Sequence, residues 1–324
     1  MTIHSNKLFP SVNKELKQLN QNLHKMIIAE HPILYAAAEK LLNTGGKRIR
    51  PALVLLVGNI TTKKQKISAE QKRLAEITEV IHNASLVHDD VIDDCETRRG
   101  VETVHSIFNN KVAILTGDFL FAQSSWYLAN LNNLDVVKTI SKVIIDFAEG
   151  EIQQGTKTFD NKISIENYIE KSFYKTASLI ACSCKATTIL SHCNEKVQED
   201  FYLFGKHLGL AFQIIDDILD ITSSTESLGK PAGSDLKNGN LTAPLMFTLE
   251  EKPELNKLIY KEFENKQDIN KAIRITTNSI GIRKAKDLAE EHIQIAIHII
   301  KSKYKHKDIK DLLLVSYYVL NRIN

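Results

Sequence analysis

Residues 86–99 read LVHDDVIDDCETRR, which places four aspartates in a stretch that otherwise has the composition of a buried helix. Aliphatic residues flank both aspartate pairs, and an unpaired carboxylate in such surroundings is costly. On a helix, Asp89 and Asp93 share one face and lie one turn apart, about 6 Å along the axis. The segment therefore predicts a helix that presents carboxylates to a partner of opposite charge.

A second segment with the same pattern lies much further along the chain. Residues 212–221 read FQIIDDILDI, so that Asp216 and Asp220 share a helix face and Gln213 precedes them. A single D-D-x-x-D motif would most simply be a solvated acidic surface. Two such clusters in one fold repel each other unless cations lie between them. Carboxylate oxygens favour Mg²⁺ shared with phosphates over zinc, so the two motifs predict a magnesium–phosphate site.

Basic residues supply the groups that such phosphates need. Residues 45–50 read GGKRIR and offer flexible backbone amides with the three cations of Lys47, Arg48 and Arg50, while Arg98 and Arg99 follow the first acidic motif. Guanidinium groups match phosphate oxygens with two parallel hydrogen bonds. Each basic cluster alone would more simply be surface charge. Beside two metal-binding helices, they predict a site for a second phosphate group.

The composition is that of a soluble globular protein, with 43% hydrophobic and 25% charged residues among 324. The net charge of +3 gives no electrostatic argument for binding nucleic acid or an anionic membrane. The four cysteines form no C-x-x-C pair, so we interpret them as reduced thiols. We find no signal peptide, transit peptide or membrane-spanning run, and we expect a soluble protein of the cytoplasm or plastid stroma. Abundant Ile, Lys and Asn indicate an AT-rich genome, such as that of a plastid or a low-GC bacterium.

Helical periodicity dominates the chain, and alternating strand patterns are scarce. A capping box of Ser68 and Gln71 opens the helix of the first motif, which we expect to end near residue 94. The Gly- and Pro-rich residues 223–244 are interpreted as an active-site loop rather than an interdomain linker. Trp126 is expected to lie in the core. Further helices are expected over residues 11–29, 32–43, 50–61, 112–131, 134–154, 164–190, 197–221, 241–251, 267–280, 282–303 and 307–321.

Taken together, these segments resemble the trans-type (all-E) polyprenyl diphosphate synthases, and among them the long-chain, solanesyl (nonaprenyl) diphosphate synthase-like members. The matching segments lie in family order and span nearly the whole chain: GGKRIRP (45–51), LVHDDVIDDCETRRG (86–100), Lys175-Thr176, FQIIDDILD (212–220) and GKPAGSDLKNGNLTAP (229–244). The resemblance implies an all-α, single-domain orthogonal helical bundle over residues 1–324, the isoprenoid synthase fold, around a deep central cavity.

The resemblance also implies roles for individual residues. Two or three Mg²⁺ ions would bridge a diphosphate to Asp89, Asp93, Asp216 and Asp220. The allylic diphosphate would contact Arg98, Lys175, Thr176, Gln213 and Lys230. Isopentenyl diphosphate would bind Lys47, Arg50, His82 and Arg99. The implied catalytic set is Asp89, Asp93, Asp216, Arg98, Lys175 and Lys230. Some relatives have a lysine at the position of Asn240, so that this contact is either lost here or replaced by a neighbour such as Lys237.

The implied activity is repeated 1'-4 head-to-tail condensation of isopentenyl diphosphate onto an allylic diphosphate. Short-chain enzymes often place a bulky aromatic residue one turn before the first motif, where this chain has Ala84 and Ser85. These small residues favour a product of about C40–C50, with nonaprenyl (solanesyl) diphosphate as the single best candidate, for a quinone side chain. The alternative, that they only permit close helix packing, stays open.

Several other functions compete with this interpretation. One is a farnesyl or geranylgeranyl diphosphate synthase. A terpene cyclase would not need Lys47, Arg50 and Arg99 for a second diphosphate. A non-catalytic partner subunit would not need intact acidic motifs. The resemblance implies a homodimer and leaves a heteromeric partner open. We expect no nucleic-acid partner, and at most transient membrane contact during product release.

Overall fold

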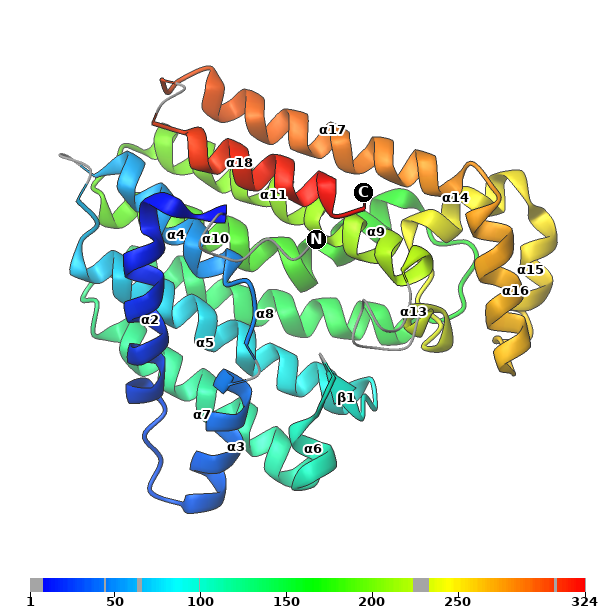
Figure 1. The fold of residues 1–324 in the computed structure, drawn as a ribbon, viewed down its shortest axis with the longest axis horizontal. Helices are drawn as coiled ribbons and strands as arrows, with labels where there is room; N and C mark the ends of the chain where they lie inside the picture. The colour runs from blue at the N-terminus through cyan, green and yellow to red at the C-terminus, as the bar shows by residue number, and fades with distance from the viewer. Residues whose placement is uncertain are drawn as a thin grey trace. The chain divides into compact units, whose positions relative to one another are not determined.

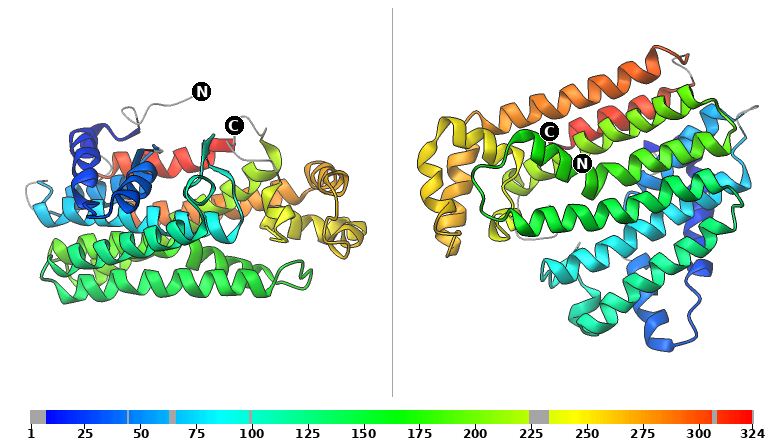
Figure 2. Two further views of the ribbon diagram at one scale, coloured as in Figure 1. Left: turned by 90° about the horizontal axis from the view of Figure 1, so that it is seen from below. Right: turned by 180° about the vertical axis from the view of Figure 1, so that it is seen from behind.

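The computed structural model describes residues 8–43, 45–62, 66–98, 100–223, 233–305 and 308–323 (Figures 1 and 2). Over these residues the chain is helical apart from one hairpin of two-residue strands and the connecting loops, which confirms the all-α prediction. Among the described helices, none is both long and apolar enough to cross a membrane.

The chain separates into two compact units, and each is described on its own. The first unit contains Met1–Val143, Leu179–Gly205 and Ile299–Val315, and the second contains Ile144–Ser178, Lys206–His298 and Ser316–Asn324. Helices α8 (Leu134–Thr156), α11 (Glu195–Thr222), α17 (Gly281–Lys301) and α18 (Lys310–Leu320) contribute residues to both units. The prediction of a single domain stays a prediction.

In the first unit, helix α5 (Ala69–Ile92) packs against α4 (Ile49–Thr61) and α7 (Asn110–Ala129). The predicted capping box is present: the Ser68 side chain accepts a hydrogen bond from the Gln71 amide, and the Gln71 side chain accepts one from the Ser68 amide. Helices α5 and α7 approach closely at Gly117, where an added Cβ would lie 2.1 Å from His88 Nε2. The helix end that carries the first aspartate motif is therefore docked against α7.

The first unit also contains a small hairpin that the sequence did not reveal. Strand β1 (Thr97–Arg98) pairs antiparallel with β2 (Val101–Glu102), and Gly100 between them has a φ of +74°. Strands of two residues are too short for an alternating pattern to show. The unit's other elements are η1 (Pro10–Val12), α2 (Asn13–Met26), α3 (Pro32–Asn43), α6 (Val104–Ile107) and most of α10 (Ser178–Leu190).

In the second unit, α9 (Ile165–Ser172) continues into a π-helical stretch, η3 (Phe173–Ala177). This stretch divides the helix predicted over 164–190. Helix α11 approaches η3 at Gly209, where an added Cβ would lie 2.6 Å from the Cα of Ala177. The close approach needs a glycine, and it places the Lys175-Thr176 pair beside the helix of the second motif.

Residues 236–272 of the second unit share a hydrophobic core of leucines with Ile259, Phe263 and Ala272. It joins α14 (Ala243–Glu251) to the short elements that follow it. The remaining elements of the unit are α13 (Ser234–Lys237), η4 (Pro253–Leu255), α15 (Asn256–Ile259), α16 (Lys266–Thr277) and η5 (Asn321–Ile323). Apart from the divided helix over 164–190, the long helices predicted from periodicity are confirmed, with their ends shifted by a few residues.

Candidate active site

The four aspartates of the first motif lie at the C-terminal end of α5. The helix ends at Ile92, Asp93 is its C-cap, and Asp94 adopts a left-handed φ of 49°. A helix C-terminus carries partial negative charge, and the last turn of α5 contains no basic residue. The aspartates add to this negative potential, so the helix end favours a bound cation.

The carboxylates of this motif differ in their surroundings. Asp90 is only 2% exposed and accepts a 2.6 Å hydrogen bond from Arg98 Nε on β1. Burial raises the pKa of Asp90, against the lowering effect of Arg98. Asp89 and Asp93 are partly exposed. Asp90 therefore anchors the hairpin, while Asp89 and Asp93 are the pair that a ligand can reach.

The structure brings together two of the residues predicted to bind isopentenyl diphosphate. Arg50 on α4 donates a 3.1 Å hydrogen bond to His82 Nε2 on α5. Lys47 is exposed just before α4. Arg48, between them, has a φ of 53° and forms an ion pair with the buried Glu79. Of the three cations in this segment, Arg48 has a structural partner, and Lys47 and Arg50 stay candidates for phosphate binding.

The two residues predicted to control chain length have different environments. Ala84 is fully buried within α5, whereas Ser85 is partly exposed. Ser85 Oγ donates a 3.0 Å hydrogen bond to the carbonyl of His82 on its own helix. The Ser85 side chain therefore turns back onto the helix and adds little volume beyond it.

The second motif lies at the C-terminal end of α11, again at the negative end of a helix without a basic residue in its last turn. Asp217 is 4% exposed and accepts hydrogen bonds from Tyr168 at 2.6 Å and Gln213 at 2.7 Å. Gln213 in turn accepts a 2.6 Å hydrogen bond from Thr176. Burial, followed by repulsion from Asp235, raises the pKa of Asp217 to about 7. Two residues predicted for the allylic diphosphate thus belong to one chain of hydrogen bonds.

Asp216 and Asp220 are one turn apart but are not equivalent. Asp220 is 1% exposed and accepts hydrogen bonds from Ser234 Oγ at 2.9 Å and from the Asp235 amide at 3.3 Å. It fastens the start of α13 to α11. The Asp216 side chain is 38% exposed and forms an ion pair with Arg322, whose Nη1 lies 2.7 Å from Oδ1. The carboxylate of the second motif that a ligand can reach is therefore Asp216.

Lys175 lies in the π-helical stretch and faces α8. Its Nζ is 2.5 Å from Glu151 and donates a 3.0 Å hydrogen bond to Gln154 Oε1. The π-helical turn that contains Lys175 has no signal in the sequence. Its predicted contact with the allylic diphosphate requires that the ion pair with Glu151 be shared or exchanged.

The donor set fits a hard divalent cation whose coordination is completed by phosphate. Among the described residues, no three Asp, Glu, His or Cys side chains gather closely enough to hold a metal by themselves. The accessible donors are the pair of carboxylates at Asp89 and Asp93 and the single carboxylate at Asp216. Mg²⁺ is commonly bound by one or two carboxylates together with substrate phosphates. A cation is already paired with Asp216, namely the guanidinium of Arg322.

Two predicted residues, Arg99 and Lys230, lie outside the described residues, as do residues 224–232 of the predicted active-site loop. Lys237 is exposed on α13, whereas Asn240 is only 8% exposed.

Comparison with known proteins identifies relatives over nearly the whole chain. The family model described as polyprenyl synthetase matches residues 31–276. A prenyl transferase of Porphyra purpurea is 55% identical over 320 residues, covering 99% of both chains. Solanesyl diphosphate synthase 1, chloroplastic, of Arabidopsis thaliana is 53% identical over 293 residues, covering 90% of this chain and 72% of the relative.

Solved structures of other proteins have the same fold as this chain. A heptaprenyl diphosphate synthase from Staphylococcus aureus has a TM-score of 0.92 at 33% identity, covering 97% of this chain and 99% of the other. A polyprenyl synthase from Caulobacter crescentus, complexed with calcium and isoprenyl diphosphate, has a TM-score of 0.93 at 27% identity, covering 99% and 98%.

Proposed function

We propose that this chain, which belongs to the polyprenyl synthetase family, makes a long all-trans polyprenyl diphosphate with solanesyl (nonaprenyl) diphosphate as its end product. The resemblance drawn from the motifs is confirmed, and the chain is a prenyltransferase. Isopentenyl diphosphate and an allylic diphosphate are the substrates of the family. The proposed product rests on the relatives named solanesyl diphosphate synthase, and its proposed use is a quinone side chain.

The observation that carries the proposal is the placement of both aspartate motifs at helix C-termini, with Asp89, Asp93 and Asp216 as the reachable carboxylates. The family uses a divalent metal. We propose two or three Mg²⁺ ions held by these three residues, joined by Asp220 if its bonds to Ser234 and Asp235 open. When bound, the metal supplies positive charge that stabilises the diphosphate leaving group.

Basic and amide side chains of the chain would act on the same leaving group. Cleavage of the allylic C–O bond leaves a carbocation and a diphosphate, on which negative charge develops. Arg98, Lys175 and Lys230 would stabilise that charge more strongly in the transition state than in the bound substrate. Thr176 and Gln213, already hydrogen-bonded to each other, would orient the diphosphate.

The second substrate would be held by the other basic group. Arg50 and His82 lie in contact, and with Lys47 and Arg99 they would bind the diphosphate of isopentenyl diphosphate. Its double bond attacks the allylic cation, and the departing diphosphate takes the proton that is then lost. Water would quench the cation, so we expect the 223–240 segment to close over the substrates.

Ala84 and Ser85 are the proposed determinants of product length. Both side chains are small, and Ser85 is bonded back to its own helix. In this proposal they leave room beneath the first motif for a growing prenyl chain. A bulky side chain at either position would limit the product.

We propose that the protein is a homodimer that uses α7 as its interface. Leu115, Phe119, Ala122 and Trp126 recur along one face of this helix. Leu115 is 51% and Trp126 is 61% exposed, so the prediction of a core position for Trp126 was wrong. An exposed apolar stripe of this kind suits a protein–protein interface. A plastid or cytoplasmic location is proposed from the chloroplastic and algal relatives.

The direct test incubates the purified chain with Mg²⁺, isopentenyl diphosphate and farnesyl diphosphate, and separates the dephosphorylated products by reversed-phase chromatography. We expect a ladder of products that ends at the nonaprenyl alcohol. A ladder that stops at farnesyl or geranylgeranyl products would replace the proposal with a short-chain synthase. Absence of turnover by the pure chain would favour a subunit that needs a dissimilar partner.

A further inference from the structure

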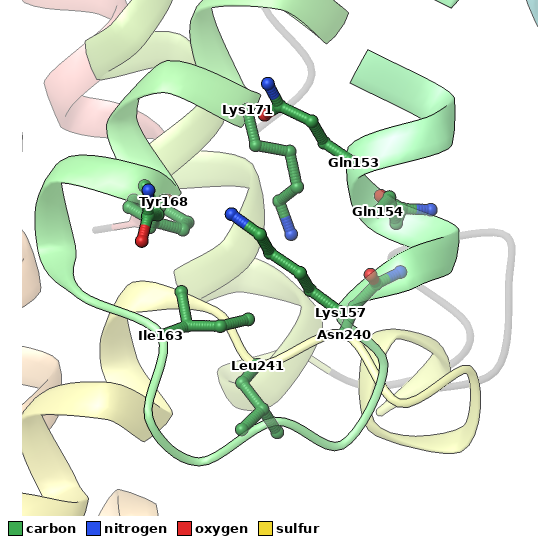
Figure 3. Close-up of a pocket in the computed structure, with 9 residues that line it drawn as sticks. Gln153, Gln154, Lys157, Ile163, Tyr168, Lys171, Asn240 and Leu241 are labelled. Atoms are coloured by element: carbon green, nitrogen blue, oxygen red, sulfur yellow. The ribbon is translucent and has the colours of Figure 1, made fainter. Parts of the chain in front are cut away.

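Tyr168 is a buried tyrosine to which the proposed condensation gives no role. It lies on α9 and is only 1% exposed. In the close-up of Figure 3 it lines a small cavity between α8, α9 and the segment that follows α13, together with Lys171 and Gln154. This cavity has a volume of about 10 Å³, which is room for about one water molecule. The residues packed around the tyrosine ring therefore hold it in one position.

The hydroxyl of Tyr168 donates a 2.6 Å hydrogen bond to Asp217 Oδ2 on α11. Burial, followed by repulsion from Asp217, raises the pKa of Tyr168 well above its usual value, so the hydroxyl keeps its proton and remains a donor. Burial also raises the pKa of Asp217, but the hydrogen bond from Tyr168 and the charge of Lys171 act in the opposite direction. Both of these groups favour the ionised form of Asp217, which can only accept hydrogen bonds.

The other oxygen of Asp217 fixes the direction of the Gln213 amide. Gln213 Nε2 donates to Asp217 Oδ1 at 2.7 Å, and Gln213 Oε1 accepts from Thr176 Oγ1 at 2.6 Å. If the amide were turned over, Gln213 Oε1 would face Asp217 Oδ1, and two acceptors at that distance repel each other. An amide nitrogen carries two protons, so Gln213 has a second N–H proton that it can donate to a ligand.

These hydrogen bonds form one chain that joins two helical segments. Tyr168 belongs to α9 and Thr176 to η3, while Gln213 and Asp217 lie one turn apart on α11. Gln213 is partly exposed, whereas the other three residues are buried. Gln213 is therefore the member of the chain that a ligand reaches most readily, and its direction is set from the buried side.

We propose that Tyr168 is a positioning residue for the allylic diphosphate and acts through Asp217 on the Gln213 amide. This role rests on the proposed function, in which Gln213 and Thr176 contact that diphosphate. With the tyrosine hydroxyl in place, Gln213 offers its second N–H proton to a diphosphate oxygen. Without the hydroxyl, Asp217 Oδ2 loses its donor and the carboxylate can turn. The Gln213 amide can then direct its oxygen toward the diphosphate, and the two groups repel each other.

The test compares Tyr168→Phe, which keeps the ring and removes the hydroxyl, with the control Tyr260→Phe. Tyr260 is 74% exposed in the same unit, and its hydroxyl accepts a hydrogen bond from Asn161. The probe is farnesyl thiodiphosphate, in which sulfur replaces the bridging oxygen and slows ionisation, and its binding with Mg²⁺ is measured by titration calorimetry. Hydrogen bonds to charged groups are strong enough that we expect Tyr168→Phe to lose about tenfold in probe affinity. Tyr260→Phe should bind the probe as the wild type does.

Kinetics and a double variant separate positioning from a general structural role. Tyr168→Phe should raise KM for the allylic substrate by a factor similar to the loss of probe affinity. KM for isopentenyl diphosphate and the half-saturating Mg²⁺ concentration should stay within about twofold of the wild type. In Gln213→Met the hydroxyl has no amide to direct, so adding Tyr168→Phe should cause no further loss of probe affinity.

An equal loss with and without Gln213 would overturn the proposal, because Tyr168 would then not act through that amide. Unchanged probe affinity in Tyr168→Phe, or an equal rise of KM for both substrates, would also overturn it, and normal wild-type condensation would leave the proposed function intact. If the wild type performs no condensation but probe binding changes as expected, the positioning role holds and the proposed function is rejected.

Asp217→Glu is the second variant if Tyr168→Phe does not fold. It keeps the charge and moves the carboxylate by one methylene. It should lower probe affinity while Gln213 is present and cause no further loss in Gln213→Met. An equal loss in both backgrounds would again overturn the proposal.

Discussion

Arg322 holds Asp216 with a guanidinium nitrogen 2.7 Å from the carboxylate oxygen, and its guanidinium also lies over the ring of Phe212 at 4.5 Å. The pair neutralises the one carboxylate of the second motif that a ligand can reach. A metal ion that binds Asp216 must displace Arg322 or share the carboxylate with it.

Replacing Arg322 should therefore strengthen metal binding in the absence of substrate. A partly exposed ion pair contributes about 0.2–1 kcal/mol, so Arg322→Gln should lower the half-saturating Mg²⁺ concentration by up to about fivefold. The measurement is a Mg²⁺ titration of the melting temperature. Arg274→Gln, at an exposed position on α16, is the control. If Arg322→Gln binds Mg²⁺ more weakly than the wild type, the metal ion does not displace Arg322 from Asp216.

The first motif should divide into reachable and dispensable aspartates. Asp89→Asn removes a carboxylate proposed to hold metal, and we expect kcat to fall by about 100-fold or more. Asp94→Asn is a matched control, because Asp94 is exposed, has a left-handed φ of 49°, and asparagine tolerates that conformation. Steady-state kinetics at saturating Mg²⁺ separate the two. An equal loss of kcat in Asp89→Asn and Asp94→Asn would show that the two aspartates do not differ in function.

Ser85→Phe should shorten the product to about C15–C20, because its ring would fill the space beneath the first motif. Product chromatography provides the readout. Ser302→Phe adds the same ring at an exposed position and should leave the product ladder as it is. If both variants give the same long product, Ser85 does not determine product length.

Gly209 should be the glycine on α11 that least tolerates a side chain. In Gly209→Ala the new Cβ would lie 2.6 Å from the backbone of Ala177, so we expect a loss of about 1–3 kcal/mol of unfolding free energy. Gly155→Ala in α8 has no atom within 4 Å of its new Cβ and should stabilise by up to about 1 kcal/mol. Urea unfolding measures both changes. A neutral Gly209→Ala would show that α11 and η3 can separate without cost.

A histidine pair should make stability depend on pH. His207 and His292 have Nδ1 atoms 2.9 Å apart, and burial followed by repulsion from His292 lowers the pKa of His207 to about 4 from its usual 6.5. The unfolded state then binds more protons than the folded state between pH 6.5 and 4. The free energy of unfolding is therefore highest, with respect to His207, above pH 6.5, and it decreases as the pH falls toward 4.

The measurement is unfolding free energy at pH 7 and pH 5. After allowance for partial exposure, the loss from His207 should be at most about 2 kcal/mol. His207→Gln should show a smaller loss than the wild type between these pH values. His298→Gln, exposed on the same helix as His292, should retain the wild-type slope. A steeper dependence of unfolding free energy on pH in His207→Gln than in the wild type would show that His207 does not cause the loss.

The sequence alone determined the helices and the two acidic motifs, because periodicity and capping are local properties. The helix over α5 and its capping box were predicted from neighbouring residues only, and both are present. The family resemblance implied one substrate for Arg50 and His82, and the structure places the two side chains in hydrogen-bond contact at 3.1 Å. The hairpin of β1 and β2 and the π-helical turn at Lys175 left no readable pattern.

Only the tertiary structure decided which aspartates are reachable. In sequence, Asp90 and Asp217 cannot be distinguished from the neighbouring aspartates. In the structure, Asp90 is buried and accepts a hydrogen bond from Arg98, and Asp217 is buried and accepts one from Tyr168. Asp216 stays partly exposed. Burial depends on which distant residues pack against a side chain, and that information is absent from a local motif. The same reason explains the error at Trp126, whose aromatic ring alone does not reveal that its helix face lacks a covering element within the described chain.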